Sequence, residues 1–219
     1  MNKAIILVSG GMDSCVTAAS AIADGYDLAF LHVNYGQLTE SRELKAFHDI
    51  ADHYLVKQKL VVDISHLFEI GGSCLTDENI EVPDADLENL DIPVSYVPFR
   101  NANILSAATS WAEVLGANTI YVGAVEDDSS GYPDCRRSFF NAFEKAIDTG
   151  TKPETSIRII TPLISLSKKE IVEKGITLNA PLHLTWSCYK QEGIPCSKCD
   201  SCALRARGFD EAGVRDPIL

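Results

Sequence analysis

Short apolar runs alternate along this chain with amphipathic stretches of helical length, and this alternation constrains the fold more than any other feature. The apolar runs have the length of buried strands and lie at 3–8, 27–34, 58–63, 118–123 and 157–160. Segments that we expect to be helices lie between them, at 13–24, 40–55 and 101–115. Strands and helices that alternate at this spacing form a parallel sheet covered by helices. The sequence therefore predicts a doubly wound, Rossmann-like α/β fold with a mostly parallel sheet.

Two regions depart from this alternation. Residues 64–98 are acidic, contain three prolines and are expected to form a long loop or lid. After about residue 184 the composition shifts to Cys, Lys and Arg, with few branched apolar residues. We therefore predict an α/β domain at 1–183 and a C-terminal metal-binding appendage at 184–219 that packs on it.

Charge and hydropathy exclude several classes of function. The 219 residues include 19 Lys and Arg against 31 Asp and Glu, a formal net charge of −12. Such an acidic surface repels nucleic acid at long range, so we expect no nucleic-acid partner. No apolar run approaches the roughly 18 residues that span a bilayer, and the first run is too short for the core of a signal peptide. We expect a cytoplasmic protein with no membrane partner.

The segment between the first strand and the first helix, Ser9-Gly10-Gly11-Met12-Asp13-Ser14, has the composition of a phosphate-binding loop. Adjacent glycines let the backbone approach a ligand closely, and successive N–H groups at a helix N-terminus attract an anion. The loop lacks the Lys of a Walker A motif and the third glycine of the dinucleotide fingerprint. We predict that it binds phosphate through the Ser9 and Ser14 hydroxyls, with Mg²⁺ between Asp13 and the phosphates. The alternative is a tight turn without a ligand.

Three expected helices begin with cations, at Arg100, Arg136 and Lys168. Ser167 and Glu170 predict a capping box at the third of them. A cation in the first turn opposes the helix dipole, so three such cases after strand exits indicate a common anion. Because the ligand crevice of a parallel sheet lies at the carboxyl ends of the strands, we expect these cations to converge there. The alternative for each is an ordinary solvated surface charge.

Four of the seven cysteines, Cys188, Cys196, Cys199 and Cys202, follow the spacing C-x7-C-x2-C-x2-C. Four thiolates in a short segment suit tetrahedral zinc and leave no open position, so we predict one structural Zn²⁺ per chain. The C-x2-C-x2-C spacing also occurs in iron–sulfur proteins, so a cluster is one alternative and free thiols are the other. Cys135 would need an activating base to serve as a nucleophile.

Several short sequence motifs then point to a family. They are VPFRN at 97–101, SGYPDCR at 130–136, TPLISLSKKEI at 161–171, TWSCY at 185–189 and CSKCDSCALRARGF at 196–209. With the SGGMDS loop, which is shared across the ATP-pyrophosphatase (PP-loop) superfamily, they resemble the 7-cyano-7-deazaguanine synthase family of queuosine precursor biosynthesis. The resemblance covers nearly the whole chain, and SGYPDCR and the cysteine-containing ending are its most specific parts. The chain departs from the family pattern at Ser197, usually glycine, and at Phe99, commonly alanine. We expect Ser197 to strain its turn and Phe99 to narrow a pocket.

The resemblance implies a fold like that of the adenine-nucleotide alpha-hydrolases, a structural zinc and a homodimer. It implies an enzyme that converts 7-carboxy-7-deazaguanine and ammonia to the 7-cyano compound with ATP. The implied route passes through an acyl-adenylate and an amide, releasing AMP and pyrophosphate. ATP and Mg²⁺ are thus the expected co-substrate and ion.

Residue roles follow from the same resemblance. The implied nucleotide-binding residues are Val8, Ser9, Gly10, Gly11, Met12, Asp13, Ser14 and Cys15. The implied catalytic residues are Asp13, Arg100, Arg136 and Lys168, and the substrate-binding residues are Asn101, Tyr132 and Asp134. Asp127 or Asp128 would accept the proton of ammonium.

Three alternatives remain at this point. The first is a related PP-loop enzyme that joins the adenylated deazaguanine to a different amine. The second is a tRNA-modifying adenylating enzyme, which the acidic charge and the chain length disfavour. The third is a non-catalytic nucleotide-binding or zinc-ribbon module, which has no need of Asp13, Arg100 and Lys168.

Overall fold

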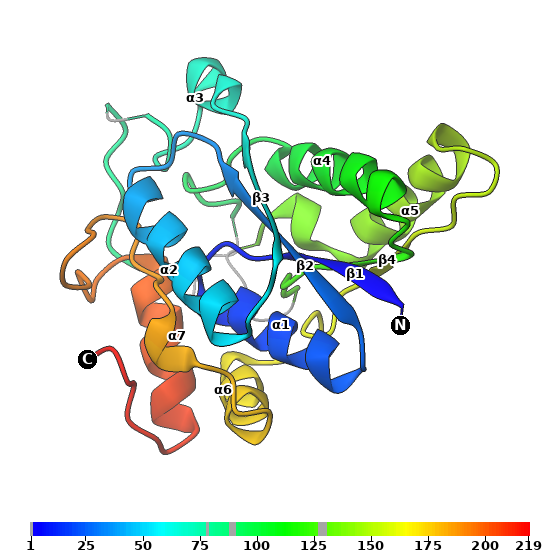
Figure 1. The fold of residues 1–219 in the computed structure, drawn as a ribbon. Coiled ribbons are helices and arrows are strands. Elements are labelled where there is room, and N and C mark those ends of the chain that lie inside the picture. The colour runs from blue at the N-terminus through cyan, green and yellow to red at the C-terminus, as the bar shows by residue number, and fades with distance from the viewer. Residues whose placement is uncertain (1, 78, 88–90, 127–130) are drawn as a thin grey trace.

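The computed structural model of the protein describes residues 2–77, 79–87, 91–126 and 131–219. These residues build a sheet of five parallel strands in the order β3-β2-β1-β4-β5 (Figure 1). The strands are β1 (Lys3–Leu7), β2 (Asp27–Asn34), β3 (Gln58–Asp63), β4 (Thr119–Tyr121) and β5 (Arg158–Ile160). Every strand lies within an apolar run that the sequence singled out, and the doubly wound α/β prediction is confirmed.

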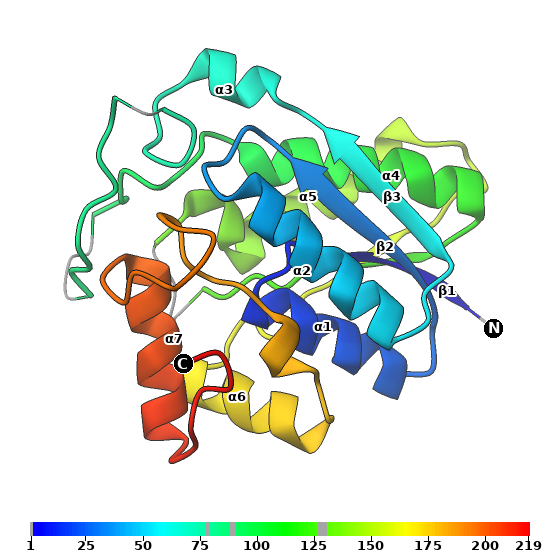
Figure 2. The same ribbon diagram turned by 60° about the vertical axis from the view of Figure 1, so that its left-hand side comes forward.

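Helices cover both faces of this sheet. They are α1 (Met12–Ala23), α2 (Glu40–His53), α3 (His66–Ile70), α4 (Arg100–Leu115), α5 (Arg137–Gly150), α6 (Lys168–Thr177) and α7 (Asp200–Glu211). Short 3₁₀ turns lie at Pro133–Cys135 and Leu182–Leu184. Helices α1 and α2 pack on one face and α4 and α5 on the other (Figure 1). Helices α6 and α7 pack together beside α1, next to the C-terminus (Figure 2).

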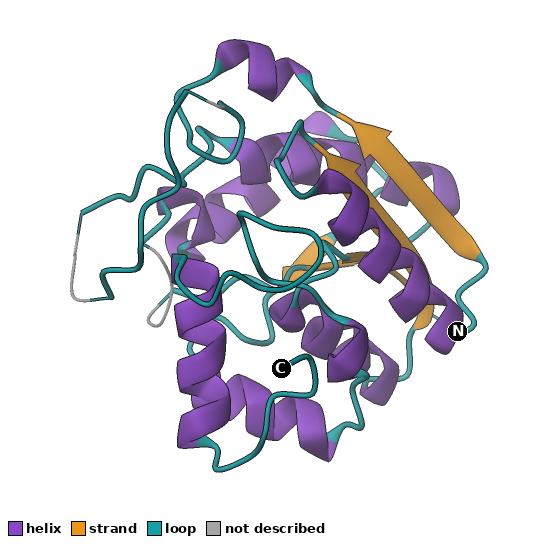
Figure 3. Ribbon diagram, turned by 90° about the vertical axis from the view of Figure 1, so that its left-hand side faces the viewer, coloured by secondary structure: helices purple, strands orange, loops and turns teal. Residues whose placement is uncertain are grey.

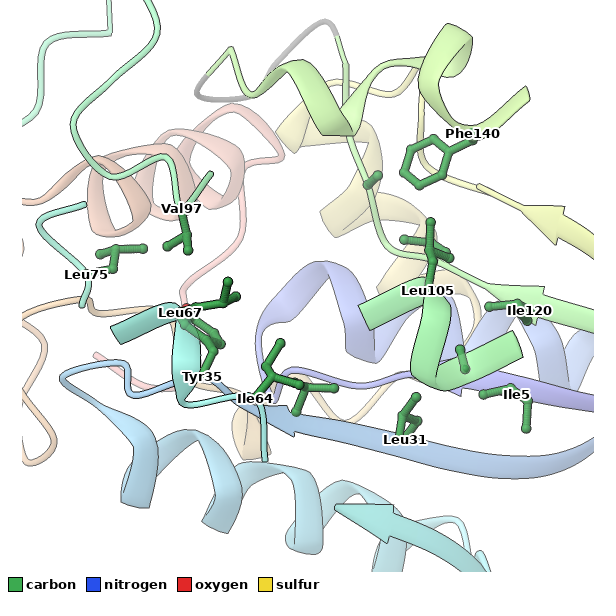
Figure 4. Packing of buried hydrophobic residues seen from close by; sticks show 14 of the residues in the cluster. Ile5, Leu31, Tyr35, Ile64, Leu67, Leu75, Val97, Leu105, Ile120 and Phe140 are labelled. Carbon is green, nitrogen blue, oxygen red and sulfur yellow. The ribbon is translucent and has the colours of Figure 1, made fainter. Parts of the chain in front are cut away.

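The side chains of β1 show why both faces are covered. Successive residues of a strand point to opposite faces, so a strand buried on both sides must be apolar at every position. Ile5 packs in the cluster that contains Leu105 of α4 (Figure 4), whereas Ala4 and Ile6 pack in the cluster that contains Phe47 of α2. The continuous apolar run at 3–8 therefore reflects a central strand.

The order of the strands creates a switch point between β1 and β4. The chain builds β1, β2 and β3 in one direction and then crosses to place β4 and β5 on the other side of β1. In open parallel sheets the ligand crevice lies outside the carboxyl ends of the strands at such a point. The chain between β1 and α1, which carries the glycine-rich loop, and the chain leaving β4 both emerge there.

The helix starts largely agree with the sequence. Helix α4 begins at Arg100, α5 at Arg137 and α6 at Lys168, and Ser167 and Glu170 form the predicted capping box. Helix α7 was not anticipated, because the cysteine-rich composition of the tail obscured its helical part. No helix in the described ranges is both long and apolar enough to cross a membrane.

The described residues of the 64–98 segment are irregular apart from the single turn of α3, and they lie on the same side of the molecule as the tail (Figure 3). Its contacts join it to that tail. The Ala85 amide donates to the Lys198 carbonyl at 2.7 Å, and Lys190 pairs with Asp84 at 3.3 Å. A role as a lid over substrate stays a prediction.

Candidate active site

A cavity of about 290 Å³ opens at the switch point. Its walls come from the carboxyl ends of β1 and β2, from the chain that follows β4, and from the first turns of α1, α4 and α6. The tail adds Trp186, Ser187, Tyr189, Ser201, Leu204 and Arg205 to the wall. The C-terminal segment therefore shapes the cavity as well as carrying the cysteines, and its predicted boundary at 183/184 stays a prediction.

The glycine-rich loop is held tightly at the cavity wall. Gly10 has a φ of +92°, and a Cβ there would lie 2.6 Å from the main-chain oxygen of Glu43, so glycine is required at this position. The Ser14 hydroxyl donates to the Gly11 carbonyl at 2.9 Å, and the Trp186 amide donates to the Gly10 carbonyl at 2.9 Å. The loop is thus fixed in a conformation that presents its backbone to the cavity.

Six of the eight predicted nucleotide-binding residues line this cavity. They are Val8, Ser9, Gly11, Met12, Asp13 and Ser14. Gly10 lies behind the wall against α2, and Cys15 is fully buried in the core beneath α1. Burial raises the pKa of Cys15 to about 12, so its side chain is a neutral packing group.

Asp13 and Lys168 meet across the cavity in an ion pair. The Lys168 Nζ lies 2.7 Å from Asp13 Oδ2, and 9% of the Lys168 side chain and 27% of the Asp13 side chain are exposed. The second oxygen, Asp13 Oδ1, is buried and has no hydrogen-bond partner among the described residues. A carboxylate oxygen without a partner beside a phosphate-type loop fits a hard divalent cation such as Mg²⁺.

Arg100 is positioned by aromatic side chains. Its Nη1 donates to the Tyr35 hydroxyl at 3.0 Å, and its guanidinium lies over the rings of Tyr35 and Tyr132 at 5.0 and 5.9 Å from their centroids. Stacking of this kind holds a planar guanidinium while its remaining N–H groups can still meet an anion. All three residues line the cavity, so the predicted convergence of cations holds for Arg100 and Lys168.

Asp134 and Asn101 fix the start of α4. The Asn101 amide donates to Asp134 Oδ2 at 2.9 Å, and the Asn101 side chain donates to the Asp134 carbonyl at 2.9 Å. Asn101 lines the cavity, whereas Asp134 is 3% exposed and lies behind it. Burial raises the pKa of Asp134, and its Oδ1 is buried with no hydrogen-bond partner in the part of the chain that the structure describes.

The remaining residues that the sequence singled out do not support a role in this cavity. Arg136 is exposed and is not part of the cavity wall, and Asp127 and Asp128 fall outside the described residues. Cys135 lines the cavity, but burial raises the pKa of its thiol to about 11, so it is no thiolate nucleophile at neutral pH. Phe99 is 60% exposed and packs edge-on against Phe139, so it does not narrow this cavity.

Sequence reasoning missed Glu43, Tyr35 and Arg205. Tyr35 directly follows β2, and this position at the carboxyl end of a parallel strand could have identified it. Glu43 lies on a helix whose other polar residues are largely exposed, and nothing in the pattern marked it. Arg205 is buried and pairs with Asp216 at 2.6 Å, which joins α7 to the C-terminal residues.

The four tail cysteines gather at one point. Their Sγ atoms all lie within 4.8 Å of one another. Cys196 Sγ and Cys202 Sγ are 3.9 Å apart, close to the ~3.8 Å edge of a sulfur tetrahedron built on Zn–S bonds of about 2.3 Å. The donor set and its spacing therefore fit a tetrahedral thiolate-bound metal. Ser197, between two of the cysteines, has a φ of +59°, which is the strain expected for a non-glycine residue there.

Comparisons with a family model and with curated proteins point to the same family. The family model described as "Queuosine biosynthesis protein QueC" matches residues 3–213. A protein of Chlorobium phaeobacteroides named 7-cyano-7-deazaguanine synthase is 60% identical over 216 residues, 99% of this chain and 96% of that protein. One of the same name from Chloroherpeton thalassium is 58% identical over the same share of both chains.

The similarity of this chain to solved structures supports its fold and nothing further. A predicted subunit of tRNA methyltransferase from Methanocaldococcus jannaschii has a TM-score of 0.51 at 15% identity, over 99% of this chain and 90% of that one. An NMN synthetase from Francisella tularensis has a TM-score of 0.50 at 14% identity, over 98% and 73%.

Proposed function

This chain belongs to the family of queuosine biosynthesis protein QueC, and from that premise we propose that it converts 7-carboxy-7-deazaguanine to 7-cyano-7-deazaguanine with ATP and ammonia. The observation that carries the proposal is the convergence of Asp13, Lys168 and Arg100 on one cavity beside the glycine-rich loop. A carboxylate has no leaving group, so it must be activated before ammonia can replace its oxygen. Adenylation supplies that leaving group.

The proposed reaction has two adenylation steps. An oxygen of the substrate carboxylate attacks the α-phosphorus of ATP, and pyrophosphate leaves. Ammonia then attacks the carboxyl carbon and displaces AMP, which gives an amide. The amide oxygen then attacks the α-phosphorus of a second ATP, and pyrophosphate leaves again. Loss of the second AMP together with both amide N–H protons leaves the nitrile.

The loop and the cations have distinct parts in this chemistry. Ser9 and residues 11–14 of the loop line the cavity, and their backbone N–H groups would bind the phosphates of ATP. Asp13 would hold Mg²⁺ through its partnerless Oδ1, and the ion would neutralise charge on the phosphates. Lys168 and Arg100 would stabilise the negative charge that develops on the transferred phosphoryl group. Arg136 remains a predicted phosphate contact at the start of α5.

The deazaguanine base would lie against the α4 side of the cavity. Tyr132 offers an aromatic face and Asn101 a polar side chain there. Asp134 Oδ1 is a buried acceptor that would meet the donors of the base if the Pro133–Cys135 turn opened toward the cavity. We further propose that the tail cysteines hold one structural Zn²⁺ and that the protein forms a homodimer.

A single incubation tests the reaction. Purified protein, Mg-ATP, ammonium and 7-carboxy-7-deazaguanine are combined, and the base is followed by mass spectrometry alongside AMP. We expect the nitrile, with one AMP for each adenylation step. A reaction that stops at an adenylate or amide would indicate a different amine acceptor. Release of AMP only after tRNA is added would indicate a tRNA-directed enzyme. No AMP at all would contradict the proposal.

A matched pair of variants tests the site. Lys168→Ala removes the cation paired with Asp13 and should abolish AMP formation. Lys169→Ala removes the neighbouring lysine, which is exposed and lies 3.8 Å from Glu173, and should leave AMP formation near the wild-type rate. Equal activity of the two variants would exclude the proposed role of Lys168.

A further inference from the structure

Glu43 is one of the residues that line the cavity, and none of the roles given above uses its carboxyl group. Glu43 lies in the first turns of α2, and its main-chain oxygen packs against Gly10 so closely that a Cβ on Gly10 would lie 2.6 Å away. Glu43 therefore sits beside the phosphate loop. It also lies near enough to Arg100 for that positive charge to lower its pKa. Glu43 thus belongs to the same cavity that would hold an adenylated substrate.

Two buried side chains orient this carboxyl group. The Thr39 hydroxyl donates to Glu43 Oε1 at 2.8 Å, and Gln37 Nε2 donates to Glu43 Oε2 at 3.2 Å. The direction of the Gln37 amide is set by its own oxygen, which accepts from the Tyr35 amide at 2.9 Å. Each carboxylate oxygen accepts one of these hydrogen bonds and keeps a lone pair for a further donor.

The environment of Glu43 brings the pKa of its carboxyl group close to neutral pH. Burial raises its pKa from 4.5 to about 7, against the hydrogen bonds from Thr39 and Gln37 and the charge of Arg100, which lower it. Glu40 on the same helix raises it further, and Tyr35, on the chain that follows β2, also interacts with Glu43. A base is most effective when its pKa lies near the working pH.

We propose that Glu43 is the proton acceptor of the amination step, an inference that rests on the proposed function. Ammonia attacks the carboxyl carbon of the acyl-adenylate, a C–N bond forms, and the C–O bond to AMP breaks with its electron pair on oxygen. The nitrogen, now positively charged, loses one N–H proton to the Glu43 carboxylate. The products are the amide, AMP and a protonated Glu43, which returns its proton to solvent.

The variant Glu43→Gln separates this step from the adenylation that precedes it. Glutamine keeps the size of the side chain, and the Thr39 hydroxyl can reverse its hydrogen bond, so the fold should be retained. Exchange of labelled pyrophosphate into ATP, measured with the acid substrate and without ammonia, should stay near the wild-type rate. Formation of amide and nitrile from ammonia should fall about 100-fold or more, the usual contribution of a general base.

The pH dependence and a matched control complete the test. At equal free ammonia, the wild-type amination rate should rise with pH through about 7, where Glu43 loses its proton, and this rise should be absent in Glu43→Gln. Glu40→Gln removes the same charge from the same helix outside the cavity wall and should keep the amination rate at high pH. The rise should remain but move to slightly lower pH, because the charge of Glu40 raises the pKa of Glu43.

Three results would overturn the inference. Glu43→Gln could aminate at the wild-type rate, or it could lose pyrophosphate exchange together with amination, which would make Glu43 a substrate-binding or structural residue. Alternatively, Asp127→Asn or Asp128→Asn could lose the amination step alone. Failure of the proposed function is distinguishable, because the wild-type protein itself would then show no pyrophosphate exchange with this acid, and the role of Glu43 would fall with it.

Discussion

Asp13 and Lys168 are separated by 155 positions in the chain, yet their side chains form the ion pair at the centre of the cavity. Lys168 is nearly buried and Asp13 is partly exposed, so removing Asp13 leaves the Lys168 charge largely uncompensated, at a cost of up to about 3–5 kcal/mol. The place of this pair beside the glycine-rich loop supports its proposed use in binding a ligand. The ligand can exchange the protein pairing for its own, with a cation on Asp13 and phosphate on Lys168.

Ser197 allows a quantitative test at the same scale. Its φ of +59° costs a residue with a Cβ about 1–2 kcal/mol, whereas glycine adopts this conformation freely but loses about 0.5–1 kcal/mol more entropy on folding. Ser197→Gly should therefore stabilise the protein by about 0.5–1 kcal/mol, measured as the shift in its urea unfolding curve. Ser110→Gly, in the middle of α4, should destabilise it, and loss of stability in both variants would refute the strain argument.

Helix α1 connects the loop to the sheet at the scale of elements. It can begin close to the switch point because Gly123, the second residue after β4, has no side chain. A Cβ at that position would lie 3.0 Å from the carbonyl carbon of Asp13 and 3.0 Å from Thr17 Oγ1. The first turn of α1, and with it the phosphate loop, is thus placed by a contact of backbone on backbone.

Gly123→Ala should push α1 away from β4. Overpacking of this kind costs about 1–3 kcal/mol, and the displaced loop should also raise the KM for ATP. Gly150→Ala is the matched control, since a Cβ on Gly150 would meet no atom within 4 Å. Thermal unfolding and ATP titration measure the two effects. An unchanged KM in a destabilised Gly123→Ala would separate packing from ligand binding and contradict the expected coupling.

At the scale of the whole molecule, the C-terminal segment and the α/β core form one site. The tail contributes cavity walls, its Trp186 amide binds the Gly10 carbonyl, and Gly208 of α7 lies so close to Lys168 that a Cβ would come within 2.9 Å. The cysteine cluster lies in the same segment. Metal binding there should therefore support the cavity at a distance from it.

Cys199→Ser tests this dependence. The variant should lose its bound metal and unfold at lower temperature, because binding of a structural metal is coupled to folding. Metal content by elemental analysis and the melting temperature are the two readouts. Cys15→Ser, in the core beneath α1, should lower the melting temperature while retaining the metal. Unchanged metal content in Cys199→Ser would exclude a four-cysteine site.

Several parts of this protein could be predicted from its sequence because they depend on local pattern. A continuous apolar run such as 3–8 predicts a strand buried on both faces, and a serine followed three residues later by glutamate predicts the cap at Ser167. The spacing of the four cysteines predicts their cluster, since few residues separate them. The glycine-rich loop after β1 belongs to the same class, because strand, loop and helix are adjacent in the chain.

Only the tertiary structure decided which distant side chains meet and in what environment. Arg100 and Arg136 both begin helices, but Arg100 is stacked on Tyr35 and Tyr132 in the cavity while Arg136 is exposed. Glu43 resembles other acidic residues of an amphipathic helix, and its raised pKa arises from burial against the phosphate loop. Burial and long-range packing set these properties, and neither is encoded in the spacing of residues along the chain.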